Sequence, residues 1–142
     1  MNKLQTVFLG LLIAALTVYS CATVPLTGRR QLSLVSDTEM LSMSFTQYDQ
    51  FMKENKLSTN TAQANMVKQV GVRIQNAVAT YFAQNNMSSQ LAGFAWEFNL
   101  VENKEVNAWC MPGGKVVVYS GILPVTKNET GLAVVMGHEI AH

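Results

Sequence analysis

The longest hydrophobic run of the chain lies near its N-terminus, where residues 7–18 are apolar except for Gly10 and Thr17. Lys3 precedes this run and Cys21 closely follows it. The run is shorter than the ~20 residues that a membrane-spanning helix needs, and it has the length of the apolar region of an export signal. We therefore predict a signal peptide over residues 1–20.

Cys21 follows the small residue Ser20, as in the cleavage sites of bacterial lipoproteins, although Tyr19 fits that pattern poorly. In this interpretation Cys21 becomes the lipidated first residue of the mature protein. The alternative is an uncleaved N-terminal anchor. Both alternatives tether the body of the protein to a bilayer, outside the cytoplasmic membrane, with residues 21–35 as the anchor and a short lead-out.

Beyond residue 35, two stretches repeat apolar residues every three or four positions, which predicts helices from about 37 to 54 and from about 60 to 84. The first helix begins at Ser36–Glu39, which has the spacing of a capping box. Both apolar stripes are expected to face the core. Their residues are Leu41, Phe45, Tyr48 and Met52, then Val67, Val70, Ile74, Val78 and Tyr81.

From Phe94 to Leu100 the apolar residues alternate with less apolar ones, which predicts a strand with one buried face. A second extended segment is expected before the turn at residues 112–114. Residues 115–123, which contain a β-branched run, predict another strand. Residues 126–129 again have capping-box spacing and begin the last helix. Two helices, a small sheet and a helix make residues 36–142 an α+β domain.

Charge and cysteine content narrow the possible functions. The net charge is +1, only 13% of the residues are charged, and the sequence has no basic tract, so we expect no nucleic-acid partner. The two cysteines are Cys21 and Cys110. If Cys21 carries lipid, Cys110 has no partner in this chain, which excludes a disulfide framework and a zinc site built from cysteines. We interpret Cys110 as a small buried filler.

The last residues, AVVMGHEIAH, place His138, Glu139 and His142 in the pattern H-E-x-x-H. Residues four apart lie on one face of a helix, so both imidazoles can bind one Zn²⁺ ion. Zinc lowers the pKa of a coordinated water toward about 7, and Glu139 can take its proton as the general base. The apolar residues around the motif predict a buried helix, in which these polar groups need partners.

Two segments, VNAWCMPGGKVVVYSGIL and ETGLAVVMGHEIAH, resemble the zinc metallopeptidases related to HtpX, Oma-type proteases and CAAX prenyl proteases. The segment PLTGRRQLSLVSDTEM is similar to the one that follows the lipid anchor in their periplasmic lipoprotein branch. The resemblance covers residues 24–142, and its most specific motifs are N-A-x-x-x-P-G-G and H-E-x-x-H.

This resemblance implies a zincin-like (gluzincin) fold in which His138 and His142 bind one zinc ion per subunit and Glu139 is the base. It implies a third ligand, a glutamate on a later helix, beyond residue 142. Because the final helix also lacks a stop signal, we expect residues 36–142 to be the N-terminal part of a peptidase domain, inactive alone. The edge strand that receives substrate in the family corresponds to Asn107, Ala108, Trp109, Cys110, Met111, Pro112, Gly113 and Gly114.

We therefore predict a zinc-dependent metalloendopeptidase of the bacterial cell envelope. It is a lipoprotein held on the periplasmic side by Cys21, and it hydrolyses peptide bonds of protein or peptide substrates in protein quality control. The alternative is a noncatalytic envelope lipoprotein, a scaffold or chaperone, with a degenerate peptidase fold. A gene that continues with a helix bearing the third ligand favours the enzyme.

The first prediction concerns the anchor. Cleavage before Cys21 and acylation of its thiol are expected, because a small residue and a cysteine end the short apolar run. Mass spectrometry of the protein from the membrane fraction measures both modifications. A mature protein that still begins with Met1 would contradict the lipoprotein interpretation.

Overall fold

The computed structural model describes residues 21–23, 30–32 and 35–142, so the predicted signal peptide lies outside the described residues. The chain divides into two units, Met1–Asp37 and Thr38–His142. In the first unit, strand β1 (Cys21–Thr23) pairs antiparallel with β2 (Arg30–Leu32), with Cys21 opposite Leu32. The sequence pattern did not predict this short hairpin, which falls in the expected lead-out.

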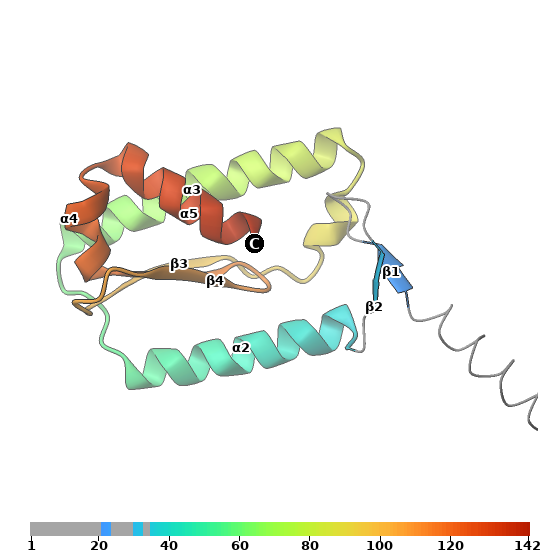
Figure 1. The fold of residues 1–142 in the computed structure, drawn as a ribbon, viewed down its shortest axis with the longest axis horizontal. Helices are drawn as coiled ribbons and strands as arrows, with labels where there is room; N and C mark the ends of the chain where they lie inside the picture. Colours follow the sequence, from blue (N-terminus) through green and yellow to red (C-terminus); the bar gives the residue numbers. More distant parts are fainter. Residues whose placement is uncertain (1–20, 24–29, 33–34) are drawn as a thin grey trace, which may run out of the picture. The chain divides into compact units, whose positions relative to one another are not determined.

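The second unit has three layers, with a sheet between helices (Figure 1). Helix α2 (Asp37–Glu54) covers one face of the sheet. Helices α3 (Thr61–Gln84) and α5 (Glu129–Ala141) cover the other face. The strands are β3 (Glu97–Val101), β4 (Ala108–Met111) and β5 (Lys115–Tyr119). This arrangement confirms the expected α+β class.

The sheet has the order β3-β5-β4, so β5 is central and β4 lies at an edge. Strand β3 runs parallel to β5, with Glu97 opposite Lys115, whereas β4 runs antiparallel to β5, with Met111 also opposite Lys115. Every residue of β5 is buried, because strands flank it on both sides and helices cover both faces. The unbroken β-branched run of its sequence matches this double burial.

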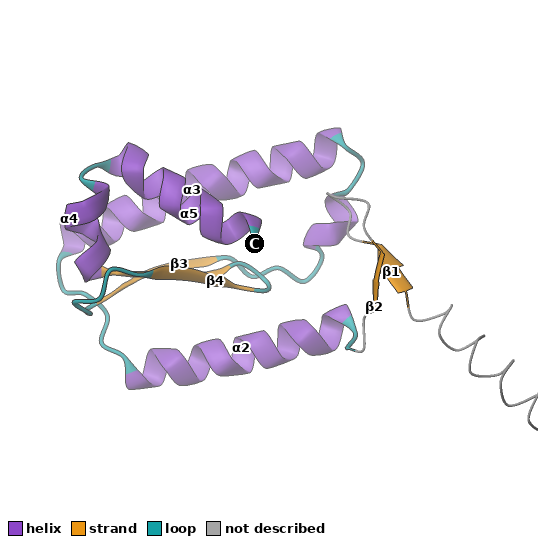
Figure 2. Ribbon diagram, in the orientation of Figure 1, coloured by secondary structure: helices purple, strands orange, loops and turns teal. Residues whose placement is uncertain are grey.

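Both long helices, drawn in purple in Figure 2, have bounds within one residue of those predicted. Helix α3 begins after Asn60, whose side chain accepts a hydrogen bond from the Gln63 N–H at 3.1 Å. That bond satisfies one of the four amides that a helix start leaves unpaired. Val67 and Val70 of the predicted stripe are fully buried, as expected, while Tyr81 near the end of α3 is 48% exposed.

Two strand predictions were wrong at their ends. Strand β3 begins at Glu97 rather than Phe94, although Ala95 N–H still bonds the Gly113 carbonyl. Strand β5 ends at Tyr119, and the 3-10 turn η2 (Ser120–Ile122) and the short helix α4 (Leu123–Thr126) replace the rest of the expected strand. Pro124 at the start of α4 favours this turn, because proline lacks the N–H that a central strand must donate.

The predicted cap of the last helix was also wrong. Thr126 ends α4, Lys127 has a positive φ of 65°, and Asn128 caps α5 by accepting a bond from Gly131 N–H at 3.0 Å. A Cβ at Gly131 would lie 2.1 Å from the Thr126 carbonyl oxygen. The sharp passage from α4 into α5 therefore requires glycine at residue 131.

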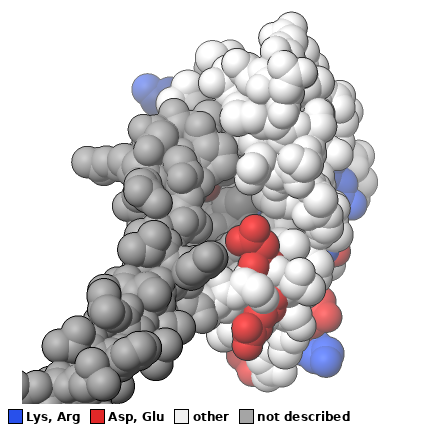
Figure 3. Space-filling model, turned by 90° about the vertical axis from the view of Figure 1, so that its right-hand side faces the viewer, with Lys and Arg blue, Asp and Glu red and all other residues white. Residues whose placement is uncertain are grey.

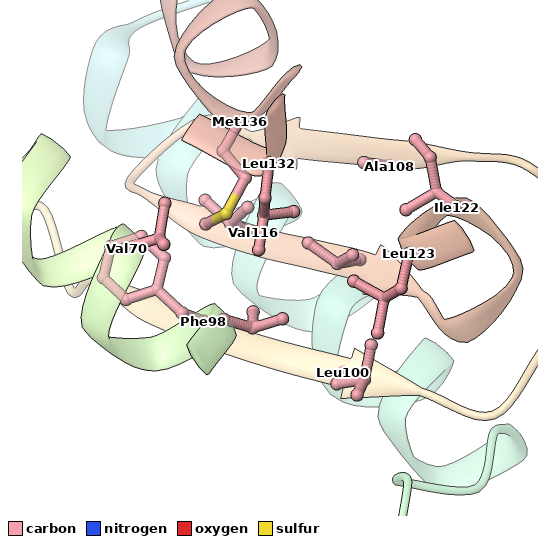
Figure 4. Close-up of a cluster of buried hydrophobic side chains, with 11 residues drawn as sticks. Val70, Phe98, Leu100, Ala108, Val116, Ile122, Leu123, Leu132 and Met136 are labelled. Carbon is pink, nitrogen blue, oxygen red and sulfur yellow. The ribbon is translucent and has the colours of Figure 1, made fainter. Parts of the chain in front are cut away.

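Two apolar clusters lie on opposite faces of the sheet. The larger one joins α3 and α5 to the sheet through Val70, Phe98, Val116 and Met136, among others (Figure 4). The smaller one joins α2 to the sheet through Tyr48, Val101, Val117 and Tyr119. Because successive residues of a strand point to opposite faces, Val116 and Val117 contribute to different clusters.

A buried charge lies on the α2 face, and the sequence pattern did not predict it. Lys115 is 6% exposed, and its ammonium lies 2.5 Å from the Glu97 carboxylate and 4.9 Å from the centre of the Phe45 ring. Tyr48 donates its hydroxyl hydrogen to the same carboxylate and accepts a hydrogen bond from Asn99. Burial is the main cause that raises the pKa of Tyr48 to about 12. The ion pair and the cation–π contact satisfy the buried ammonium.

One face of the described residues carries few charged side chains. On the face drawn in Figure 3, most atoms belong to uncharged residues, Asp and Glu side chains gather together, and Lys and Arg lie at the margins. Among the residues that the structure describes, none of the helices is long and apolar enough to cross a bilayer.

The second prediction concerns the contact between α3 and β3. A Cβ at Gly71 would lie 2.3 Å from the Phe98 ring, so Gly71→Ala should lower the free energy of unfolding by about 1–3 kcal/mol. Gly137→Ala is the control, since nothing lies within 4 Å of the added Cβ and alanine favours a helix by up to about 1 kcal/mol. Urea unfolding followed by circular dichroism measures both. Equal stability of the two variants would contradict the close approach of α3 to β3.

Candidate metal centre

Helix α5 carries the H-E-x-x-H motif, and its position is set by one buried face. Leu132 and Met136 are fully buried against the sheet, whereas Val134 is 69% exposed. His138 and His142 are exposed, and Glu139 is half-buried. The prediction of a buried helix was therefore wrong for the face that bears Val134 and the two histidines. Its apolar composition does not distinguish the face that meets the sheet from the face that meets solvent.

The two histidines converge at the C-terminal end of α5. Their Nε2 atoms lie 3.1 Å apart, and the ring planes are perpendicular with centroids 4.5 Å apart. One helical turn separates the residues, so their side chains lie one above the other on the same face. Both ligand-type nitrogens therefore point at a single region beside the helix.

This separation fits a shared metal ion. Two nitrogens bound to one tetrahedral zinc ion at 2.0–2.1 Å lie roughly 3.3 Å apart, close to the observed 3.1 Å. Neutral imidazole nitrogen is also a preferred donor for zinc. The residues present can thus supply two of the ligands of a zinc site, and the exposed position of both rings leaves room for further ligands.

A third ligand is not found within the described residues, which contain no cluster of three or more His, Cys, Asp or Glu side chains placed to hold a metal. Glu97, one of three glutamates considered from the sequence, is engaged by Lys115 and Tyr48. Glu102 and Glu105 belong to the segment between β3 and β4. None of the three therefore joins the histidine pair.

Glu139 lies near the edge strand β4. The pKa of the Cys110 thiol is raised to about 11, mainly because the thiol is partly buried and to a lesser extent because of the negative charge of Glu139. Helix α5 packs on β4, and Ala108 and Cys110 contribute to the cluster that holds Leu132 and Met136. The candidate base is thus placed beside the strand that the sequence predicted to contact substrate. Cys110 is free but only half-buried, so it packs beside the core and is not the fully buried filler that the sequence predicted.

The remaining residues of the predicted edge-strand segment pair with β5, pack toward α2 or form the turn between β4 and β5. The Asn107 carbonyl accepts a bond from Tyr119 N–H, and the Met111 carbonyl accepts one from Gly114 N–H. Trp109 and Met111 point toward α2 and pack on its cluster. Pro112, Gly113 and Gly114 form the turn into β5, and both glycines have positive φ, which explains the choice of glycine. No other described strand pairs with β4 on its outer side.

Comparison with known proteins agrees with these features. Residues 68–142 match the profile "Peptidase family M48". The chain is 46% identical to the mitochondrial metalloendopeptidase OMA1 of Schizosaccharomyces pombe over 38% of this chain and 16% of that protein. It is 28% identical to the Beta-barrel assembly-enhancing protease of Escherichia coli over 99% of this chain and 28% of that protein.

The human "Metalloendopeptidase OMA1, mitochondrial" is 26% identical over 94% of this chain and 25% of its own length. The chain thus spans between 16% and 28% of the length of these relatives. The matched profile covers more than half of the chain and includes both histidines, Glu139 and the edge strand. On this match, together with the convergent histidine pair on α5, the chain belongs to peptidase family M48.

Proposed function

We propose that this protein is a zinc-dependent metalloendopeptidase and that the described residues supply part of its active site. The observation that carries the proposal is the pair of Nε2 atoms, 3.1 Å apart, on a helix that also bears Glu139. The membership of family M48 supports it. His138 and His142 are the proposed metal ligands, and Glu139 is the proposed general base.

The proposed roles of the metal ion and of Glu139 follow from the chemistry of zinc and from the position of Glu139 beside the metal ligands. A bound zinc ion would polarise the scissile carbonyl and acidify a water molecule. Glu139 neighbours His138 in sequence and is only half-buried, so we propose that its carboxylate accepts the proton of the attacking water. The same carboxyl group can then return the proton to the leaving amine.

A third protein ligand completes the proposed site. Catalytic zinc sites usually have three protein ligands and one open position. The described residues offer two, and the family resemblance implies a glutamate on a later helix. We propose that a carboxylate beyond residue 142 takes this position, and that residues 36–142 bind zinc weakly without it.

The proposed substrate is an extended segment of a protein chain that pairs with β4. The other edge of the sheet is already occupied, because Leu57 forms a bridge with Val101 and Ser58 N–H bonds the Leu100 carbonyl. Strand β4 is therefore the edge with backbone groups left to pair, and it lies beside Glu139. Backbone pairing gives affinity with little demand on the sequence of the substrate.

The proposed location is the bacterial cell envelope, on the periplasmic side, through lipid on Cys21. The apolar run and Ser20-Cys21 support this proposal, as does the similarity over 99% of the chain to a relative named for β-barrel assembly. A role in protein quality control is proposed on the same basis.

The third prediction separates the base from the ligands. In the full gene product, Glu139→Gln should retain zinc and lower kcat by about 10²–10⁴-fold, because it removes the proton acceptor and no ligand. His138→Ala or His142→Ala should lose both zinc and activity. Casein cleavage and metal analysis by mass spectrometry measure these effects. Glu129→Gln is the control, since Glu129 lies at the far end of α5 and pairs with Arg73.

Unchanged cleavage by Glu139→Gln would refute the assignment of the base. Absence of cleavage by the zinc-loaded wild type would instead favour the noncatalytic scaffold or chaperone. These two outcomes are distinct, because metal analysis reports the ligands independently of activity.

The fourth prediction concerns Cys110. With a pKa near 11, the thiol holds its proton at pH 8, and its thiolate fraction is about a hundredfold lower than that of an ordinary cysteine. Iodoacetamide at pH 8 should therefore modify Cys110 slowly and spare activity, whereas a chelator abolishes it. Peptide mapping measures alkylation, with the urea-unfolded chain as the control. Rapid alkylation of the folded protein would contradict the raised pKa of this half-buried thiol.

A further inference from the structure

The turn that ends β4 is held by α2, a helix on the opposite face of the sheet from the histidine pair. The hydroxyl of Ser44 donates a hydrogen bond of 2.7 Å to the carbonyl of Pro112, 68 residues further along the chain. Ser44 is only 5% exposed, and it is one of two buried polar or charged residues of the described core. A buried hydroxyl that reaches a backbone carbonyl so far along the chain ties two distant segments together.

Leu41 and Phe45, apolar neighbours of Ser44 on α2, pack against the same turn at Gly113. The position of a Cβ at Gly113 would lie 2.5 Å from the Phe45 ring and 3.0 Å from Leu41, so the backbone of the turn lies directly on α2. On the other side, Ala95 N–H bonds the Gly113 carbonyl, and Glu97 N–H bonds the Gly114 carbonyl. The turn is thus fixed from α2 and from the start of β3 together.

This turn fixes the position of the end of β4, the edge strand. Met111, the last residue of β4, immediately precedes Pro112, and its carbonyl accepts the bond from Gly114 N–H. Cys110, one residue earlier, packs against the cluster that holds Leu132 and Met136 of α5, the helix that bears Glu139. The end of β4 therefore lies between α2 on one face of the sheet and α5 on the other (Figure 1).

We propose that Ser44 is a positioning residue for substrate binding, which acts through the Pro112 carbonyl to hold the edge strand β4 at a defined distance from Glu139. This inference rests on the proposed function, since it assigns Ser44 to the strand that receives the peptide. Ser44 touches neither metal ligands nor substrate. Its loss should weaken the capture of the peptide rather than the chemistry that follows.

The fifth prediction tests this role in the zinc-loaded full gene product. Ser44→Ala should raise KM for casein about three- to tenfold, the change expected from loss of one hydrogen bond, while kcat stays within about twofold. Ser44→Thr keeps the hydroxyl and should recover most of the affinity. Ser42→Ala is the matched control, because Ser42 lies two residues away on the exposed side of α2 and its hydroxyl does not reach the turn.

A second readout does not depend on activity. Hydrogen–deuterium exchange of the peptide spanning residues 108–115 should become about three- to tenfold faster in Ser44→Ala and remain unchanged in Ser42→Ala. If Ser44→Ala does not fold, Ser44→Cys replaces it, since a thiol of similar size is a weaker donor. The same direction of change is then expected for KM and for exchange.

The outcomes separate the two proposals. Wild-type KM in Ser44→Ala, or a fall in kcat with KM unchanged, would overturn the positioning role. If the wild type cleaves no casein, the proposed function fails, and the affinity of labelled casein for the Ser44 variants together with the exchange rates decides this inference. Casein affinity that is the same in wild type and Ser44→Ala would overturn it there as well.

Discussion

The complete burial of β5 is the constraint on which the rest of the structure depends. Val116, Val117 and Val118 are fully buried, with β3 on one side, β4 on the other and helices on both faces. Alternate residues of this strand anchor different layers, so α5 and α2 are both positioned by the same five-residue segment. Each valine exchanges a large apolar surface for protein contacts, worth on the order of 2 kcal/mol per side chain. The histidine helix and the edge strand thus share one support.

Much of this arrangement could be predicted because it follows from local periodicity. The bounds of α2 and α3 could be predicted from the spacing of their apolar residues. A helix that packs on a sheet must repeat its apolar face every three or four residues, and the repeat stops where the helix ends. The histidine pair could be predicted for the same reason. A spacing of four residues places two side chains on one helical face whatever the tertiary structure, and here their Nε2 atoms meet at 3.1 Å.

The features that could not be predicted depend on contacts between distant segments. No spacing in the sequence relates Ser44 to Pro112, and nothing near Lys115 indicates that its ammonium is buried against Glu97 and Phe45. The predicted end of β5 was wrong because Ile122 and Leu123 resume the apolar pattern after Ser120 and Gly121. The chain instead turns there against the segment before β4, where Gly121 N–H bonds the Asn103 carbonyl. A Cβ at Gly121 would lie 2.2 Å from the Lys104 carbonyl, a contact that only the folded chain creates.

Because His138 and His142 are exposed, the fold does not need to provide buried hydrogen-bond partners for their imidazoles. A buried imidazole needs protein partners, but exposed rings can be hydrated, so the core does not require His138 and His142 to converge. Stability comes from Leu132 and Met136, which precede both histidines on α5, and these side chains set the rotation of the helix against β4. With that rotation, Glu139 is half-buried and both histidines are exposed. The division between a packed face that orients the helix and an exposed face that bears the proposed ligands would allow metal chemistry without a buried unpaired charge.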